Sequence, residues 1–552
     1  MSNKINIIVE GKDFTIDKDT TLLELIQEHY TDIQFKVLAG NINHTVNNLR
    51  TCLNDNDNVE FITYSSSIGR EIYRRSLSFL LFRAIFETQR NTRLVLSRSV
   101  GNSWYYDFYS DTPVTEGFLS KIEEKMQEYV KNNEEITSEI LPRERAREFF
   151  EERAYADKVR LLKHVDHENI EIYKTGKVYD YNHLPCVPSA AHLAAFELRP
   201  YESGFLLVFP NPKSSNKMSH IPYQPKLFKI HQEAKEWGRI LRINNIGRLN
   251  EYISRDRGPE LIRIAEAFHE KKIAQIADQI KQNSSELKIV FIAGPSSSGK
   301  TTFSKRLRTH LLVNGIEPHV ISLDDFYLDR ECTPKKKDGT FDFEHIKAID
   351  IKLFNKILFD LLKGEKVCLP KFDFAQGMRI KDARKIEMFE DQILIIEGIH
   401  GLNEALTFSV PKRNIFKIYI SALTQISIDD HNRISTRKNR LIRRMVRDNT
   451  FRGYSALNTL KIWPSVTAGE EKWIFPFQEK ADIIFNSALF YELSVLKPHI
   501  IPLLEEIPKD DPCHLQASNL LNFLKLIKSI DNEADIPSTS ILREFIGGSA
   551  FK

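Results

Sequence analysis

The sequence predicts an α/β protein whose C-terminal half is built on a parallel sheet that leads into a glycine-rich loop. Three observations indicate this fold. Between 287 and about 507, apolar runs typical of buried strands alternate with helical patterns. The first of these runs is followed by the segment GPSSSGKT and then by a helical pattern. Ahead of this half, about sixty N-terminal residues form a pattern of short strands around one helix.

The chain is long enough to bury several cores, because 41% of its 552 residues are hydrophobic. We expect five segments. They are a β-grasp-like domain at 1–64, an α+β domain at 65–212, a helical connector at 213–286 with a long helix at 258–282, the parallel-sheet domain at 287–508, and a helical tail at 509–552 with one helix near 515–530 and no recognised function.

Charge and cysteine usage limit the classes of function. The chain has 78 basic and 75 acidic residues, so its formal charge of +3 is too small for a nucleic-acid footprint over the whole surface. Its five cysteines lack the CxxC spacing of zinc or redox sites, which favours a reducing cytoplasm. We expect a cytoplasmic protein without signal peptide or membrane partner, and we see no pattern that predicts an oligomeric state.

The glycine-rich segment matches G-x-x-x-x-G-K-[ST]. Glycines allow backbone N–H groups to turn toward phosphate oxygens, and the following helix presents its positive end. A chance Gly/Ser turn is the alternative, but the preceding strand and following helix favour ATP and Mg²⁺ as cofactors. Lys300 would reach the β- and γ-phosphates, and the Thr301 hydroxyl would bind Mg²⁺. The predicted nucleotide-binding residues are Gly294, Pro295, Ser296, Ser297, Ser298, Gly299, Lys300, Thr301 and Thr302.

Acidic residues follow two further buried strands. HVISLDDFYL ends with Asp324 and Asp325, and in a parallel sheet such strand ends face the ligand crevice. A carboxylate there could accept the proton of an attacking hydroxyl, or it could merely cap the next element. QILIIEGIHGL places Glu397 at the end of the other strand, where it could bind Mg²⁺ or belong to a turn that uses Gly398.

A basic helix is predicted between Arg433 and Arg452, where eight basic residues accompany one acid. Its arginines recur at three- and four-residue intervals and therefore share one face. Three interpretations stay open: a lid that closes over ATP, a solvated face, and a contact with RNA. The lid interpretation fits the neighbouring phosphate-binding loop best.

The order of motifs resembles the uridine kinase and phosphoribulokinase family over roughly two hundred residues. The motifs are the P-loop, ISLDDFY, FDFEH, LPKFDFAQGMR, IIEGIHGL and RLIRRMVRDNTFRGY. The resemblance implies transfer of the γ-phosphate of ATP to a small-molecule hydroxyl, most specifically that of a nucleoside. It implies Asp324 as catalytic base with Lys300, Arg444 and Arg447, metal binding by Thr301 and Glu397, and an acceptor pocket of Tyr327, Phe343, Glu344, Phe372 and Arg379.

The chain departs from the uridine kinase pattern at three places. Glu344 stands where these kinases usually have Asp, and Gly377 and Tyr454 stand where they commonly have His and Arg. The last two positions would lie near the base of the acceptor. The resemblance therefore implies phosphoryl transfer more firmly than it implies uridine.

The N-terminal half resembles parts of threonyl-tRNA synthetases. The helix opened by Asp19-Thr20-Thr21 and the segment FKVLAGNINHTV resemble a TGS domain, and RRSLSFLLFRAI with LPCVPSAAHLAAFEL resembles the second additional domain of these enzymes. The complete layout is similar to bacterial uridine kinase-like nucleoside kinases.

The synthetase-like segment lacks the editing residues of that family. Arg75 and Phe79 replace the paired histidines, Cys186 replaces the later histidine, and Asn182 replaces the cysteine. Arg and Phe are neither metal ligands nor bases at neutral pH. A rearranged zinc site could be imagined from the residues His183, Cys186 and His192, although a structural role is the more usual one.

We therefore expect a retained scaffold that binds RNA or the C-terminal domain itself. Two hypotheses remain: a small-molecule kinase, and an RNA- or tRNA-binding regulatory ATPase. The acceptor motifs FDFEH and LPKFDFAQGMR favour the kinase, because a switch ATPase needs no acceptor pocket.

Overall fold

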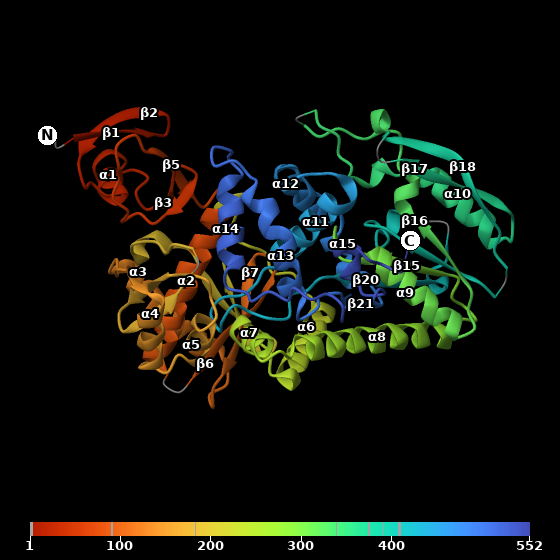
Figure 1. The fold of residues 1–552 in the computed structure, drawn as a ribbon, viewed down its shortest axis with the longest axis horizontal. Helices are drawn as coiled ribbons and strands as arrows, with labels where there is room; N and C mark the ends of the chain where they lie inside the picture. The colour runs from red at the N-terminus through yellow and green to blue at the C-terminus, as the bar shows by residue number, and fades with distance from the viewer. Residues whose placement is uncertain are drawn as a thin grey trace.

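The computed structural model describes residues 4–89, 92–182, 184–337, 339–373, 376–389, 391–406 and 410–551. The N-terminal elements lie on one side of the molecule, the C-terminal parallel sheet lies on the other, and the helices near the end of the chain lie between them (Figure 1). The long helix α8 (Gly258–Gln282) runs along one edge and leads into the parallel sheet.

The first domain has the β-grasp fold. Its sheet has the order β2-β1-β5-β3-β4, with β1 and β5 parallel and the other neighbours antiparallel. Thr21 and Glu24 form a capping box at the start of the single helix, as S/T-x-x-E patterns predict. The elements are β1 (Lys4–Val9), β2 (Lys12–Asp17), α1 (Leu22–His29), β3 (Val37–Ile42), β4 (Thr45–Asn47) and β5 (Asn58–Thr63).

The second domain packs the buried helix α2 (Ser67–Thr88) against two antiparallel sheets. One sheet has the order β11-β12-β7-β6 and the other β10-β9-β8. The remaining elements are β6 (Arg93–Val100), β7 (Ser103–Tyr109), α3 (Glu116–Lys131), β8 (Thr137–Pro142), α4 (Arg143–Glu151), α5 (Ala156–Leu162), β9 (Asn169–Thr175), β10 (Val178–Tyr181), β11 (Glu197–Tyr201) and β12 (Gly204–Val208).

The connector is not wholly helical. It begins with a hairpin of β13 (Pro210–Asn211) and β14 (Ser214–Met218), which corrects the expectation of a helical segment from 213. Three helices follow, α6 (Pro225–Leu241), α7 (Ile246–Ser254) and α8, and the last has the bounds that the sequence pattern predicts.

The C-terminal domain is built on a five-stranded parallel sheet in the order β16-β19-β15-β20-β21. All residues of β15 and β19 are buried, which explains their uninterrupted apolar sequences. The elements of this domain are β15 (Ile289–Ala293), α9 (Lys300–Val313), β16 (Pro318–Ser322), α10 (Ile351–Leu362), β17 (Val367–Asp373), β18 (Met378–Ile386), β19 (Ile393–Glu397), β20 (Ile415–Ser421), α11 (Thr436–Arg452), α12 (Ala456–Trp473), β21 (Ile483–Asn486) and α13 (Glu492–Glu505).

The tail departs from the expected single helix. It contains α14 (His514–Leu524) and the short α15 (Arg543–Ile546), and α14 ends before the predicted 530. The end of the chain lies beside β15 and α9, so the tail returns to the glycine-rich loop (Figure 1).

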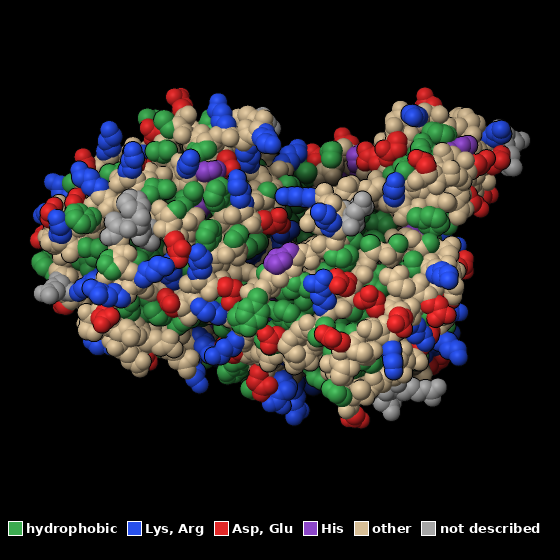
Figure 2. Space-filling model, turned by 180° about the vertical axis from the view of Figure 1, so that it is seen from behind, with side chains coloured by type: hydrophobic (Ala, Val, Ile, Leu, Met, Phe, Trp, Pro, Cys, Tyr) green, Lys and Arg blue, Asp and Glu red, His purple; other side chains and the backbone are tan. Residues whose placement is uncertain are grey.

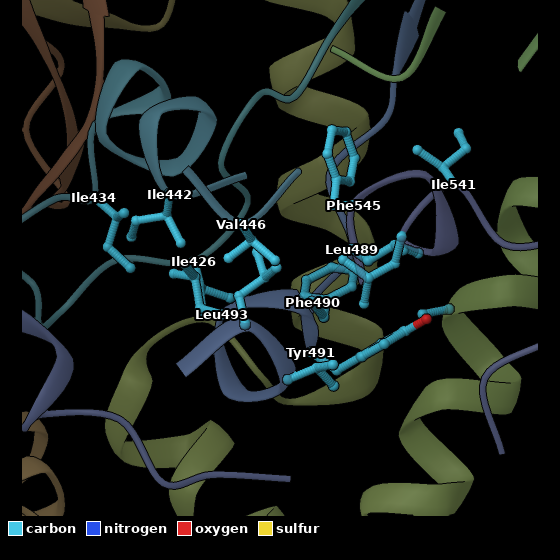
Figure 3. Packing of buried hydrophobic residues seen from close by; sticks show 14 of the residues in the cluster. Ile426, Ile434, Ile442, Val446, Leu489, Phe490, Tyr491, Leu493, Ile541 and Phe545 are labelled. Atoms are coloured by element: carbon cyan, nitrogen blue, oxygen red, sulfur yellow. The ribbon is translucent and has the colours of Figure 1, made fainter. Parts of the chain in front are cut away.

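One hydrophobic core joins the two halves. The largest buried cluster runs from α4 and α5 through α8 into the parallel sheet and the tail, and part of it is seen in Figure 3. On the face in Figure 2, Lys and Arg side chains are interspersed with Asp and Glu, in keeping with the small net charge. Among the described residues, no helix combines the length and apolar character needed to cross a membrane.

Candidate active site

The glycine-rich segment forms a tight loop between β15 and α9. Ser297 (φ 58°) and Gly299 (φ 86°) adopt left-handed backbone conformations, which turn successive N–H groups toward one side. A Cβ on Gly294 would collide with the carbonyl oxygen of Ile420, so only glycine fits there. The buried hydroxyls of Ser297 and Ser298 have no hydrogen-bond partner among the described residues. This arrangement fits the phosphates of a nucleotide.

The first turn of α9 carries the remaining residues of the motif. The Lys300 ammonium donates to the carbonyls of Gly294 (3.0 Å) and Pro295 (3.1 Å), so it lies over the loop. Thr301 is exposed. The backbone N–H and the hydroxyl of Thr302 both donate to Oε2 of Glu544, at 3.1 and 2.8 Å. A carboxylate from the tail is therefore bound at the start of the P-loop helix.

Asp324 and Asp325 have different surroundings. Oδ1 of Asp325 accepts a hydrogen bond from the backbone N–H of Phe372 on β17 (3.4 Å). Asp324 instead interacts electrostatically with Lys300 and Arg447. Burial raises the pKa of Asp324 above its usual value. The positive charge of Lys300 lowers this pKa, but by less than burial raises it. Asp324 is thus the member of the pair that interacts electrostatically with the phosphate-binding loop.

Glu397 ends the strand next to β16. It is in register with Ser322, whose hydroxyl donates to Oε1 of Glu397 (3.0 Å). Burial, together with the negative charge of Asp324, raises the pKa of Glu397 to about 7. Because a cation would compensate this buried charge, Glu397 is a candidate ligand for a hard divalent ion.

Three of the five predicted acceptor residues gather near Asp324. The ring of Tyr327 contacts that of Phe372, with centroids 5.7 Å apart. The negative charges of Asp324 and Glu344 both raise the pKa of Tyr327, after burial as the main cause. Burial, with the nearby charge of Glu470, raises the pKa of Glu344 to about 7. Aromatic and acidic side chains therefore gather near Asp324.

The other two acceptor residues lie differently. Phe343 is 43% exposed and its ring contacts Phe341. Arg379 forms an ion pair with Asp350, the N-cap residue of α10, at 2.9 Å. Its guanidinium is therefore engaged in holding β18 to α10.

Gly377 and Tyr454, two of the three positions that depart from the uridine kinase pattern, have different surroundings. Gly377 has a φ of 68°, and a Cβ there would meet the guanidinium of Arg330 at 2.7 Å. The side chain of Arg330 thus takes the space beside residue 377. Tyr454 is 51% exposed.

The arginine helix α11 packs on the phosphate-binding loop. Arg440 forms a bidentate ion pair with Glu470 (2.5 and 2.6 Å) and donates to the Ser296 carbonyl (3.0 Å). Arg443 pairs with Glu492 and donates to the Ser487 carbonyl. Both arginines are fully buried, which excludes a solvated or RNA-facing role for these two.

Arg444 and Arg447 lie closer to the predicted chemistry. Arg444 donates to the Ser296 hydroxyl (2.7 Å), and Arg447 is near enough to Asp324 to lower the pKa of that acid. Asp448, which is buried, accepts hydrogen bonds from both arginines. It therefore holds the two guanidinium groups in place.

The editing-site positions of the synthetase-like domain are buried. Asn182 donates to the Cys186 sulfur (3.2 Å), and burial raises the pKa of that thiol. Burial lowers the pKa of His192 to about 4. His183 lies outside the described residues. Among those that are described, no group of three or more His, Cys, Asp or Glu is placed to hold a metal.

A loop of the C-terminal domain, residues 429–433, inserts into this domain. Arg75, at an editing position, donates to Oδ1 of Asn432, whose amide donates in turn to the Tyr181 carbonyl (3.0 Å). The ring of His431 lies 4.0 Å from that of Phe82, between centroids.

Charged contacts hold the same loop. Nδ1 of His431 is 2.9 Å from Asp180, and the buried Lys158 bridges Asp180 (2.6 Å) and Asp429 (3.5 Å). Arg93 forms a bidentate pair with Asp430. The loop leads directly into α11.

Sequence reasoning missed four acids that organise the site: Asp448, Glu470, Glu492 and Glu544. Asp448 is the single acid in the predicted basic helix, which is a signal in the sequence. The other three are brought to the loop or to α11 from distant segments.

Comparison with known proteins adds to this geometry. Residues 289–490 match the model of the phosphoribulokinase/uridine kinase family. The C-terminal domain is therefore similar to that family. The matched segment covers the P-loop, both acid-bearing strands and the arginine helix.

The N-terminal region is similar to threonine–tRNA ligases. The chain is 32% identical to that of Ehrlichia ruminantium (strain Gardel) over 176 residues, which is 32% of this chain and 28% of the ligase. It is 27% identical to a Clostridium kluyveri ligase over 232 residues, or 41% and 36% of the two chains. The chain thus spans about a third of the length of these relatives.

Two solved structures with some similarity are described as kinases. One is a "Possible Uridine Kinase from Bacillus stearothermophilus" (TM-score 0.25, 19% identity, covering 36% of this chain and 89% of that one). Another is a D-glycerate 3-kinase from Cryptococcus neoformans (TM-score 0.22, 14% identity, 46% and 87%).

Proposed function

We propose that the protein is an ATP-dependent kinase that phosphorylates a small-molecule hydroxyl, most specifically the 5'-hydroxyl of a nucleoside. One observation carries this proposal. Asp324 and Glu397, at the ends of neighbouring parallel strands, both interact electrostatically with Lys300 of the phosphate-binding loop. These interactions support a site in which Asp324 accepts a proton, Glu397 binds a cation and Lys300 binds phosphate.

In the proposed reaction, Asp324 takes the proton of the acceptor hydroxyl. The hydroxyl oxygen forms a bond to the γ-phosphorus while the bond from that phosphorus to the β-phosphate oxygen breaks, giving ADP. Burial of Asp324 suits it to this role, because a raised pKa makes a carboxylate a better proton acceptor. Lys300, Arg444 and Arg447 supply positive charge around the transferred group.

Thr301 and Glu397 are the residues that would hold Mg²⁺. When bound, the ion neutralises charge on the β- and γ-phosphate oxygens. The hydrogen bond from Ser322 fixes the orientation of the Glu397 carboxylate.

A nucleoside suits the acceptor pocket. The carboxylate of Glu344 can accept hydrogen bonds from ribose hydroxyls, and the rings of Tyr327 and Phe372 offer apolar faces to a sugar or base. Arg330 fills the space beside Gly377, so the base would meet a guanidinium where uridine kinases commonly present an imidazole.

We further propose that the N-terminal half is a scaffold for the kinase. Its former editing pocket holds Asn432 and His431, and these residues precede the helix that carries Arg444 and Arg447. The same contacts speak against the RNA- or tRNA-binding ATPase, since the kinase loop lies where a bound 3' end would need room.

The test is an assay of the full chain with ATP, Mg²⁺ and a panel of nucleosides and polyols. ADP release and the phosphorylated product are both measured, with Lys300→Ala as control. We expect acceptor-dependent ADP release. ATP hydrolysis that needs tRNA and leaves every acceptor unphosphorylated would favour the rival function.

A further inference from the structure

The tail of the chain packs onto the phosphate-binding loop. The side chain of Ile541 touches Gly299 so closely that a Cβ on the glycine would meet Cγ2 of Ile541 at 2.5 Å. Ile541, Leu542 and Phe545 are fully buried, and Figure 3 shows Ile541 and Phe545 near Leu489. The guanidinium of Arg443 lies over the ring of Phe545, 5.0 Å from its centroid.

Polar contacts fix the backbone of this segment. Arg543 donates to the side chain of Glu533 (2.9 Å) and to the carbonyls of Glu533 (2.8 Å) and Ile536 (3.0 Å). The Ser540 hydroxyl donates to Glu266 on α8 (2.6 Å). These contacts anchor the tail before Glu544, and the buried ring of Phe545 anchors it after Glu544.

Glu544 itself is only partly buried, and its carboxylate binds the start of α9. Thr302 is the third residue of that helix, so its N–H has no acceptor within the helix. In a loop of this type, such N–H groups and hydroxyls receive the phosphates of the nucleotide. The carboxylate and a phosphate cannot share the Thr302 N–H and hydroxyl, and like charges repel.

We propose that Glu544 is an internal competitor of ATP, which must exchange the carboxylate for a phosphate when it binds. The proposal rests on the proposed function, because it assumes that the loop binds ATP. Rotation of one side chain toward solvent suffices for the exchange, since the surrounding tail is held by its own contacts. The tail thereby lowers the affinity for ATP and raises the ATP concentration at which the nucleotide site is half occupied.

The test is calorimetric titration of the full chain with ATP, ADP and adenosine. ATP must break the hydrogen bonds from Thr302 to the Glu544 carboxylate before its phosphate can bind there. Removing this carboxylate in Glu544→Ala should therefore tighten ATP and ADP binding about tenfold. Glu544→Gln, which keeps the size but loses the charge, should give a smaller gain. Adenosine carries no phosphate, so its affinity should not change.

Asp535→Asn is the matched control. It removes a tail carboxylate that pairs with Arg263 on α8 (2.7 Å) rather than with the P-loop, and ATP affinity should stay as in the wild type. Equal or weaker ATP binding by Glu544→Ala, or an equal gain for adenosine, would overturn the proposal. Failure of the wild type and all variants to bind ATP would instead overturn the proposed function.

Discussion

Nη1 of Arg75 donates a hydrogen bond to Oδ1 of Asn432 at 2.5 Å, although 357 positions separate the two residues. Arg75 lies in the N-terminal half and Asn432 in the C-terminal domain, and both side chains are buried. Because α11 begins at Thr436, this bond lies at the base of the helix that carries Arg444 and Arg447. The contact links the second domain to the proposed site of phosphoryl transfer.

We expect Arg75→Ala to lower turnover as well as stability. The change leaves the buried oxygen of Asn432 without its donor, at a cost of about 1–3 kcal/mol. It also loosens the base of α11, so kcat should fall several-fold while the affinity for ATP changes less. Steady-state kinetics and urea unfolding measure the two effects.

Arg83→Ala provides the control for that prediction. Arg83 is a buried arginine on the same helix, but its partners Glu87, Glu134 and Thr175 lie in the N-terminal half. It should lose stability and keep its kcat per folded molecule. An equal fall of kcat in both variants would mean that Arg75 acts on turnover only through the stability of the fold.

Lys300→Ala should abolish phosphoryl transfer and leave the fold intact. The ammonium bonds only to two carbonyls of its own loop among the described residues, so little packing depends on it. Turnover and the far-UV circular dichroism spectrum are the measurements. Normal turnover by the folded variant would remove the P-loop from the mechanism.

Glu397→Gln should raise the Mg²⁺ concentration needed for half-maximal turnover. An amide is a poorer ligand for a hard cation than a carboxylate, and higher Mg²⁺ should restore part of the activity. The measurement is turnover over a Mg²⁺ series. An unchanged Mg²⁺ dependence would contradict the assignment of Glu397.

The stability contribution of Glu344 should depend on pH. Its pKa rises from 4.5 to about 7 on folding, so the folded state favours the neutral form. The ionised form therefore costs stability progressively between these two pH values and in full above pH 7. Glu344→Gln should raise the free energy of unfolding at pH 8 by about 1–2 kcal/mol and have little effect at pH 4.5.

Urea unfolding at several pH values checks this prediction, with the exposed Glu365→Gln as control. The control should give a curve parallel to the wild type. A gain for Glu344→Gln that is the same at every pH would mean that ionisation of Glu344 is not its cause.

The parts of this molecule that the sequence predicts are local in the chain. The P-loop, the strand ending at Glu397 and the helix at 258–282 each lie within one short segment, where periodicity and residue type are informative. The bonds from Thr302 to Glu544 and from Arg75 to Asn432 join segments 242 and 357 positions apart. No pattern in either segment specifies its partner. The same holds for Glu470, which reaches Arg440 from the next helix.

The comparison of Asp324→Asn with Asp325→Asn tests the account most directly. Asp324 interacts electrostatically with Lys300, whereas Asp325 accepts a hydrogen bond from the Phe372 N–H, so the proposed mechanism assigns the acceptor's proton to Asp324 alone. The measurement is steady-state phosphorylation of the best acceptor, together with ATP affinity. We predict that Asp324→Asn lowers turnover by about a hundredfold or more with ATP affinity little changed, and that Asp325→Asn has a small effect. Near-normal turnover by Asp324→Asn would contradict the proposed mechanism.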